Sequence, residues 1–203
     1  MNWQEFTALL VLATAMSFTP GPNTALATAQ AANHGLKRTL PFICSVAAGW
    51  GMLLTLSALG LGALMLAVPL LSLAVELVGA AYLLWLAFGL MDLGRLREAD
   101  SSRLSVTLWE GAAMQFVNIK AWMLALAIIS GWFAGRPDAD QRFAVVVPLM
   151  LAYAFGSNLA YALVGSLLRT WLAGPDASGR RLLAFNRLMA LVSAATAVWM
   201  LLR

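Results

Sequence analysis

Charged residues and the side chains that build catalytic or metal sites are scarce in this sequence. Only 11% of its 203 residues are charged, and it has one histidine and one cysteine, Cys44. A single cysteine excludes an intramolecular disulfide and a cysteine-cluster metal site. With one histidine and no His-Glu-x-x-His motif, an enzyme is disfavoured. We therefore expect no catalytic residue, no metal and no cofactor.

What the sequence does contain is apolar. Hydrophobic residues make up 62% of the chain and the mean hydropathy is +0.82, beyond what a water-soluble domain of this length carries. The net charge of +4 does not indicate nucleic-acid binding, because Lys and Arg lie in short groups between long apolar runs. The sequence predicts an all-α integral membrane protein in the lipid bilayer, with residues 1–203 forming a single domain.

Six apolar stretches are predicted to cross the membrane, whose hydrocarbon core is ~30 Å thick. They are Phe6–Asn33, Leu40–Val75, Leu77–Met91, Gly111–Gly135, Phe143–Leu168 and Leu188–Leu202, the last extended by Leu182–Asn186. A tight turn near Ala67-Val68-Pro69 is expected to separate the second and third spans.

A cleaved signal peptide is the alternative interpretation of the first span, because Ala27-Thr28-Ala29 resembles a cleavage site. Against it, Met1 to Glu5 contains no Lys or Arg, and the apolar run is longer than that of a signal peptide.

The positions of the basic residues predict the orientation, because Lys and Arg in short loops resist translocation. Nine of the thirteen fall in the connections after spans one, three and five: Lys37, Arg38, Arg95, Arg97, Arg103, Arg169, Arg180, Arg181 and Arg187. The opposite side has only Arg136, Arg142 and Arg203. Both termini are therefore expected to face outward.

The tetrapeptide Pro20-Gly21-Pro22-Asn23 is expected to break the first span. The two prolines remove backbone donors and disfavour helical geometry in the residues before them, Gly21 tolerates unusual dihedral angles, and Pro22 suits the first position of a new helix. The second half-helix then begins inside the membrane, where its free N–H groups and partial positive charge can receive a carboxylate. A kink that serves only helix packing is the alternative.

The fourth span contains a second interruption at Asn118-Ile119-Lys120, about ten residues and hence ~15 Å from its inner end. A lysine at this depth costs at least ~2.5–3.5 kcal/mol on insertion, so it is expected to face the interior and mark a substrate path. Gln115 and Asn118 are its polar neighbours. In the fifth span, Ser157, Asn158 and Tyr161 either line the same cavity or hold helices together.

Two spans with matching interruptions suggest an inverted repeat of three helices plus three. Met16-Ser17-Phe18-Thr19-Pro20 aligns with Met114-Gln115-Phe116-Val117-Asn118. The prediction is that the first three helices superpose on the last three.

These motifs also carry a family resemblance. The segment from Thr14 to Asn23 (TAMSFTPGPN), the later Asn33-His34-Gly35, and the segment from Val78 to Leu86 (VGAAYLLWL) resemble the LysE/RhtB family of amino-acid exporters. Most members have Asn-Pro-Lys in the fourth helix, whereas Gln115 to Lys120 (QFVNIK) is similar to the branch that contains the cysteine/O-acetylserine exporter, as is Phe155-Gly156-Ser157-Asn158.

The resemblance implies six helices in a bacterial inner membrane and efflux of a small amino acid or derivative driven by the proton motive force, and it allows a homodimer. An inorganic-ion transporter would be expected to place carboxylates or clustered histidines within its spans, and this sequence has neither. A transporter of another small solute, or a membrane assembly subunit that transports nothing, remains the alternative.

Overall fold

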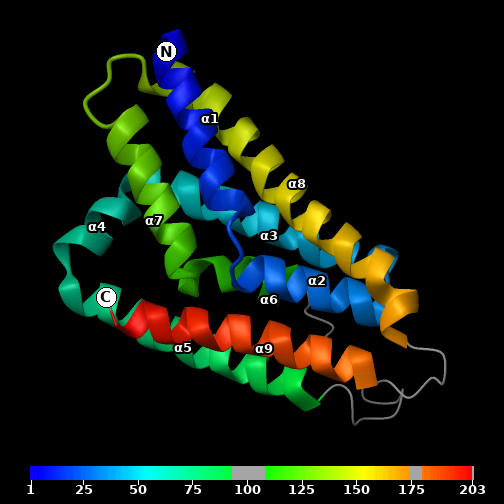
Figure 1. The fold of residues 1–203 in the computed structure, drawn as a ribbon. Coiled ribbons are helices and arrows are strands. Elements are labelled where there is room, and N and C mark those ends of the chain that lie inside the picture. Colours follow the sequence, from blue (N-terminus) through cyan, green and yellow to red (C-terminus); the bar gives the residue numbers. More distant parts are fainter. Residues whose placement is uncertain (93–107, 174–179, 203) are drawn as a thin grey trace.

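A computed structural model describes residues 1–92, 108–173 and 180–202, and all regular secondary structure in them is helical (Figure 1). The helices are α1 (Trp3–Phe18), α2 (Pro22–His34), α3 (Leu36–Leu56), α4 (Gly62–Ala67), α5 (Pro69–Asp92), α6 (Leu108–Ala113), α7 (Ile119–Ile128), α8 (Ala139–Ala173) and α9 (Arg180–Leu201). Shorter helical turns join α3 to α4 (Ser57–Leu61), follow α6 (Met114–Val117) and extend α7 (Ile129–Phe133).

Within the described ranges, four helical segments are long and apolar enough to cross a membrane: Leu36–Ala67, which is kinked at Gly60, Pro69–Met91, Ala139–Leu172 and Arg180–Trp199. A fifth is formed if Leu108–Val117 and Ile119–Phe133, which meet at a 68° bend, make one broken span. The chain is thus a multi-pass helical membrane protein. The predicted turn after Ala67 is confirmed, because α4 ends there and α5 begins at Pro69.

Helix α2 lies at the centre of the bundle, packed against α3, α8 and α9. Nearly every residue of it is buried, and most of them are small. Small side chains let the neighbouring backbones approach closely, as in other membrane helix contacts. At its C-terminus, Gly35 adopts φ +83°, a conformation that favours glycine, and the chain turns directly into α3.

The remaining helices pack in pairs around this centre. Helix α5 runs antiparallel to α9 along one side of the molecule, and α3 packs against α8 (Figure 1). A reciprocal pair of amide hydrogen bonds ties α2 to α9, with Asn33 donating to Asn186 at 2.9 Å and Asn186 donating back at 3.2 Å. Asn186 is fully buried, so this pair fixes the position of α9 against the central helix.

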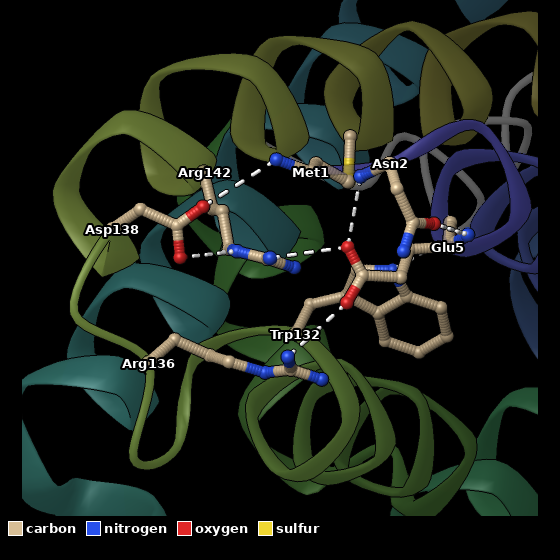
Figure 2. A network of polar contacts seen from close by, with 7 residues as sticks. All are labelled: Met1, Asn2, Glu5, Trp132, Arg136, Asp138 and Arg142. Atoms are coloured by element: carbon tan, nitrogen blue, oxygen red, sulfur yellow. Dashed lines mark hydrogen bonds and ion pairs between the residues drawn. The ribbon is translucent and has the colours of Figure 1, made fainter.

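A cluster of charges, the Glu5 cluster, joins the start of α1 to the connection between α7 and α8 and to the first turn of α8 (Figure 2). The Glu5 carboxylate accepts hydrogen bonds from the Asn2 N–H at 3.0 Å and from Arg142 at 3.1 Å, and it lies 3.2 Å from the Arg136 guanidinium. Arg142 also donates to Asp138 at 2.8 Å, and the Trp132 indole donates to the Glu5 carbonyl.

These contacts favour the charged carboxylates. The hydrogen bond from the Asn2 backbone, followed by that from Arg142, lowers the pKa of Glu5 below its usual value. The hydrogen bond from Arg142 likewise lowers the pKa of Asp138. The cluster therefore holds this end of the molecule together most strongly when both carboxylates are ionised.

Several of the described basic residues lie at the two ends of the molecule, and which end faces the cytoplasm stays a prediction. Arg136 and Arg142 belong to the Glu5 cluster at one end. At the other end of α8, the Arg169 guanidinium lies beside Gly35, and Arg181 donates to the Trp171 carbonyl and stacks on its ring. Four basic residues of the orientation prediction, Arg95, Arg97, Arg103 and Arg203, lie outside the described residues.

Candidate functional site

The predicted break in the first span is present. Helix α1 ends at Phe18, Thr19 and Gly21 are extended, and α2 begins with Pro22 at its first position. Thr24 closes the new N-terminus, because its hydroxyl accepts from the Gly21 N–H at 2.9 Å and donates to the Gly21 carbonyl at 3.0 Å. This leaves the N–H groups of Asn23 and Thr24 at the free end of α2 without partners in their own helix.

The role predicted for Gly21, tolerance of unusual dihedral angles, is wrong. Gly21 has φ −166° and ψ −175°, an extended conformation that any residue adopts. A small residue is favoured here instead because the Lys120 side chain lies close to this backbone: a Cβ at position 21 would lie 3.3 Å from Nζ of Lys120. Glycine therefore makes room for the lysine.

The second interruption is also present, although no proline produces it. Asn118 leaves helical geometry, with φ −91° and ψ +101°, and its side chain accepts a hydrogen bond from the Lys120 N–H at 3.1 Å. This is an N-cap interaction, and it starts α7 as a new helix. A second half-helix N-terminus therefore lies within the fourth predicted span.

The two interruptions meet in space through an amide pair. Asn23 donates from Nδ2 to Oε1 of Gln115 at 2.8 Å, and Gln115 donates from Nε2 to Oδ1 of Asn23 at 3.3 Å. Gln115 is fully buried and also donates to the Gly111 carbonyl. Paired, satisfied amides hold the start of α2 against the turn that follows α6.

Lys120 bridges the two breaks. Its Nζ donates to the carbonyl oxygen of Thr19, just beyond the end of α1, at 2.6 Å. A cation is favoured there because the carbonyl end of a helix carries partial negative charge. The ammonium thus lies where α1 ends and α2 begins, beside Gly21.

Residues of both interruptions, of α3 and of α8 line a cavity of about 70 Å³. Lys120 is the only charged residue among the described residues that line it, and the polar ones are Ser17, Asn23, Thr24, Asn118, Ser157 and Asn158. The rest of the wall is apolar, including Trp50 and Met150. Two helix N-termini and one ammonium give this cavity a positive electrostatic potential.

The three candidate residues of the predicted fifth span differ in whether they line the cavity. Ser157 and Asn158 are buried and line the cavity. Both also donate to the Ala154 carbonyl one turn earlier in α8, at 3.4 and 2.8 Å. Tyr161 does not line it; its hydroxyl donates to the Phe18 carbonyl at 2.8 Å and so satisfies the end of α1.

Seven of the ten predicted site residues therefore line one cavity: Gly21, Pro22, Asn23, Asn118, Lys120, Ser157 and Asn158. Pro20, Gln115 and Tyr161 lie at the breaks but do not line it. Among the polar and aromatic residues of the wall, the prediction missed Ser17, Thr24 and Trp50. Thr24 could have been found, because it stands three residues after the cap of α2, at the spacing of a capping box, whereas Trp50 lies in an unremarkable apolar run.

Comparison with known proteins gives the family. The sequence model of the LysE type translocator family matches residues 14–202. Proteins named cysteine/O-acetylserine efflux protein are similar to this chain: that of Klebsiella pneumoniae is 29% identical over 80% of this chain and 82% of its own length. The corresponding protein of Salmonella choleraesuis is 30% identical over 75% of this chain and 78% of its own.

No solved structure matches this chain significantly. The family match begins before the first interruption and continues through α9, so it includes every residue that lines the cavity. The chain therefore belongs to the LysE type translocator family.

Proposed function

We propose that this protein exports small amino acids or their close derivatives from the cytoplasm across a bacterial inner membrane. The observation that carries the proposal is the meeting of two half-helix N-termini and Lys120 at one cavity in a multi-pass helical protein. The family membership and the similarity to proteins named cysteine/O-acetylserine efflux protein support the same substrate class.

The substrate carboxylate binds at the start of α2, in this proposal. The N–H groups of the first turn have no partners within the helix, and the helix dipole favours a negative charge there. Lys120 lies beside Gly21 at the same point and supplies the opposite charge. Its bond to the Thr19 carbonyl can be exchanged for the carboxylate, so that binding also releases the end of α1.

Six membrane helices in a single domain, arranged as a 3+3 inverted repeat, complete the proposed architecture. Each half has a broken helix, α1–α2 or α6–α7, followed by two further membrane segments. These are Leu36–Ala67, which is kinked at Gly60, and α5 in the first half, and α8 and α9 in the second. The repeat relates α1–α2 to α6–α7, α3 to α8 and α5 to α9, and the helices of each pair are in contact. Asn23 of α2 pairs with Gln115 beside α6, α3 packs on α8, and α5 packs on α9. A two-fold pseudosymmetry axis through the site would give this pattern.

The orientation proposed from the basic residues places the Glu5 cluster outside and the end near Gly35 and Arg169 inside. The N-terminus lies in the Glu5 cluster, so it faces outward. Coupling to the proton motive force and assembly as a homodimer are further parts of the proposal, testable with a protonophore and by cross-linking in native membranes.

The first test measures amino acids and O-acetylserine in the medium of cells that overproduce the protein, beside a vector control. Lys120→Met is the informative variant, because it removes the ammonium and keeps an apolar stem of similar length. Lys37→Met is its matched control, since Lys37 is exposed at the start of α3 and lies outside the cavity. All variants are compared at equal membrane levels.

Enrichment of one or two small amino acids that Lys120→Met abolishes and Lys37→Met preserves is the expected result. Equal export by both variants would remove Lys120 from the site. If no amino acid is enriched with the unaltered protein, the alternative roles, transport of another small solute or ion or a membrane assembly function, become the better explanation.

A further inference from the structure

One buried hydrogen-bond acceptor at the cavity has no partner. Asn158, in α8, is only 4% exposed and lines the cavity. Its Nδ2 donates to the Ala154 carbonyl at 2.8 Å, but its Oδ1 receives no hydrogen bond from any described residue. An acceptor buried in this way lacks the hydrogen bonds that water would supply, and leaving it unpaired is unfavourable.

The hydrogen bond to Ala154 decides which atom of the Asn158 amide is oxygen and which is nitrogen. If oxygen and nitrogen were exchanged, two oxygens would face each other at the Ala154 carbonyl, so Nδ2 must point to Ala154. Oδ1 is then the atom that remains for a ligand. It accepts from a donor and offers no donor itself, which suits an ammonium or hydroxyl group.

The start of α2 and Lys120 offer the cavity hydrogen-bond donors instead of an acceptor. The free N–H groups of α2 and the Lys120 ammonium all donate, and they suit a carboxylate. An α-amino acid carries an ammonium and a carboxylate on the same carbon. A cavity that offers donors from α2 and Lys120, and an unpaired acceptor from Asn158, matches both groups at once.

We infer that Asn158 is the specificity residue for the α-amino group, accepting its hydrogen bond at Oδ1 while the carboxylate lies at α2 and Lys120. This inference rests on the proposed export function and names the substrate class within it: small amino acids whose side chain is uncharged. No described cavity residue is a carboxylate, so a cationic side chain would meet Lys120 without a compensating charge.

Ligand binding to purified protein tests the inference without requiring transport. The two ligands are L-cysteine, kept reduced, and 3-mercaptopropionate, which is the same molecule without the amino group. The dissociation constant of each is obtained from ligand-induced stabilisation against heat. L-serine with 3-hydroxypropionate and L-alanine with propionate serve as second and third pairs.

The unaltered protein is expected to bind the amino acid roughly 10- to 100-fold more tightly than its amine-free analogue, because one hydrogen bond to a charged group contributes about this factor to affinity. Asn158→Leu should reduce this ratio toward one while the analogue still binds. The control Asn186→Leu changes another buried asparagine, one that does not line the cavity, and should leave the ratio unchanged.

The outcomes separate this inference from the function on which it rests. If the unaltered protein distinguishes amine from analogue and Asn158→Leu does so equally, Asn158 is not the specificity residue, although the export proposal stands. If every pair binds without discrimination, the inference fails in the same way. If no amino acid binds and none is exported, the proposed function fails and the inference fails with it.

Discussion

The central helix α2 and α8 approach closely at Gly165, and replacing this glycine with alanine should separate the two helices. An added Cβ would lie 3.0 Å from the carbonyl carbon of Thr28 and would overlap its oxygen. Both partners are backbone atoms in helices, so no side chain can rotate away to relieve the overlap. Helix α2 or α8 would have to move.

Gly156 provides the matched control within α8. A Cβ there would meet no atom within 4 Å, so Gly156→Ala changes the same residue type in the same helix without a steric conflict. In a helix interior alanine is favoured over glycine by roughly 0.5–1 kcal/mol, and this gain is common to both variants. Overpacking at Gly165 adds a cost of about 1–3 kcal/mol.

Gly165→Ala should therefore be about 1–3 kcal/mol less stable than Gly156→Ala. For a chain of this size the difference corresponds to a midpoint roughly 2–12 °C lower in thermal unfolding. The assay is loss of the monodisperse peak in size-exclusion chromatography after heating the detergent-solubilised protein. Because α2 also lines the cavity, export should fall with it. Equal stability of the two variants would refute the close packing of α2 against α8.

Three smaller perturbations test other contacts. The pKa values of Glu5 and Asp138 are lowered on folding, so their ion pairs stabilise the protein above about pH 4.5 and lose this effect as the pH falls through the lowered pKa values. Glu5→Gln should therefore unfold at a lower temperature than the unaltered protein near neutral pH, and at the same temperature in strong acid. Asn118→Ala removes the cap of α7 and should cost about 1 kcal/mol, whereas Asn118→Ser should restore most of it in the same heating assay. Tyr161→Phe leaves the Phe18 carbonyl without its donor and should cost roughly 0.5–1.5 kcal/mol; an unchanged midpoint would show that this bond does not stabilise the end of α1.

Local patterns predicted the helices because their causes are local. Apolar length determines where a chain can cross a bilayer, and the doubled proline at Pro20 and Pro22 prevents helical hydrogen bonding whatever the surroundings. The turn before Pro69 was predicted for the same kind of reason. The six-span count and the inverted repeat stay predictions, supported by the contacts between counterpart helices.

The sequence predicted many of the residues of the candidate site but not the contacts between them. Lys120 was singled out because a charge in a membrane span is costly, which is a property of one position. That it donates to Thr19, and that Gly21 is small to make room for it, depends on residues about a hundred positions apart. Gln115 was expected beside Lys120, yet it pairs with Asn23 and holds the two breaks together.

The sequence by itself therefore determined that this protein belongs in a lipid bilayer, that it is helical, where its two interruptions lie, and most of the polar residues of the candidate site. Each follows from hydropathy, proline geometry or the cost of a buried charge, which act over a few residues. Tertiary structure alone decided that the two interruptions share one cavity and that Asn158, one of the residues lining it, has an acceptor without a partner among the described residues. Such contacts join distant segments, and only the packing of α2 among α3, α8 and α9 brings them together.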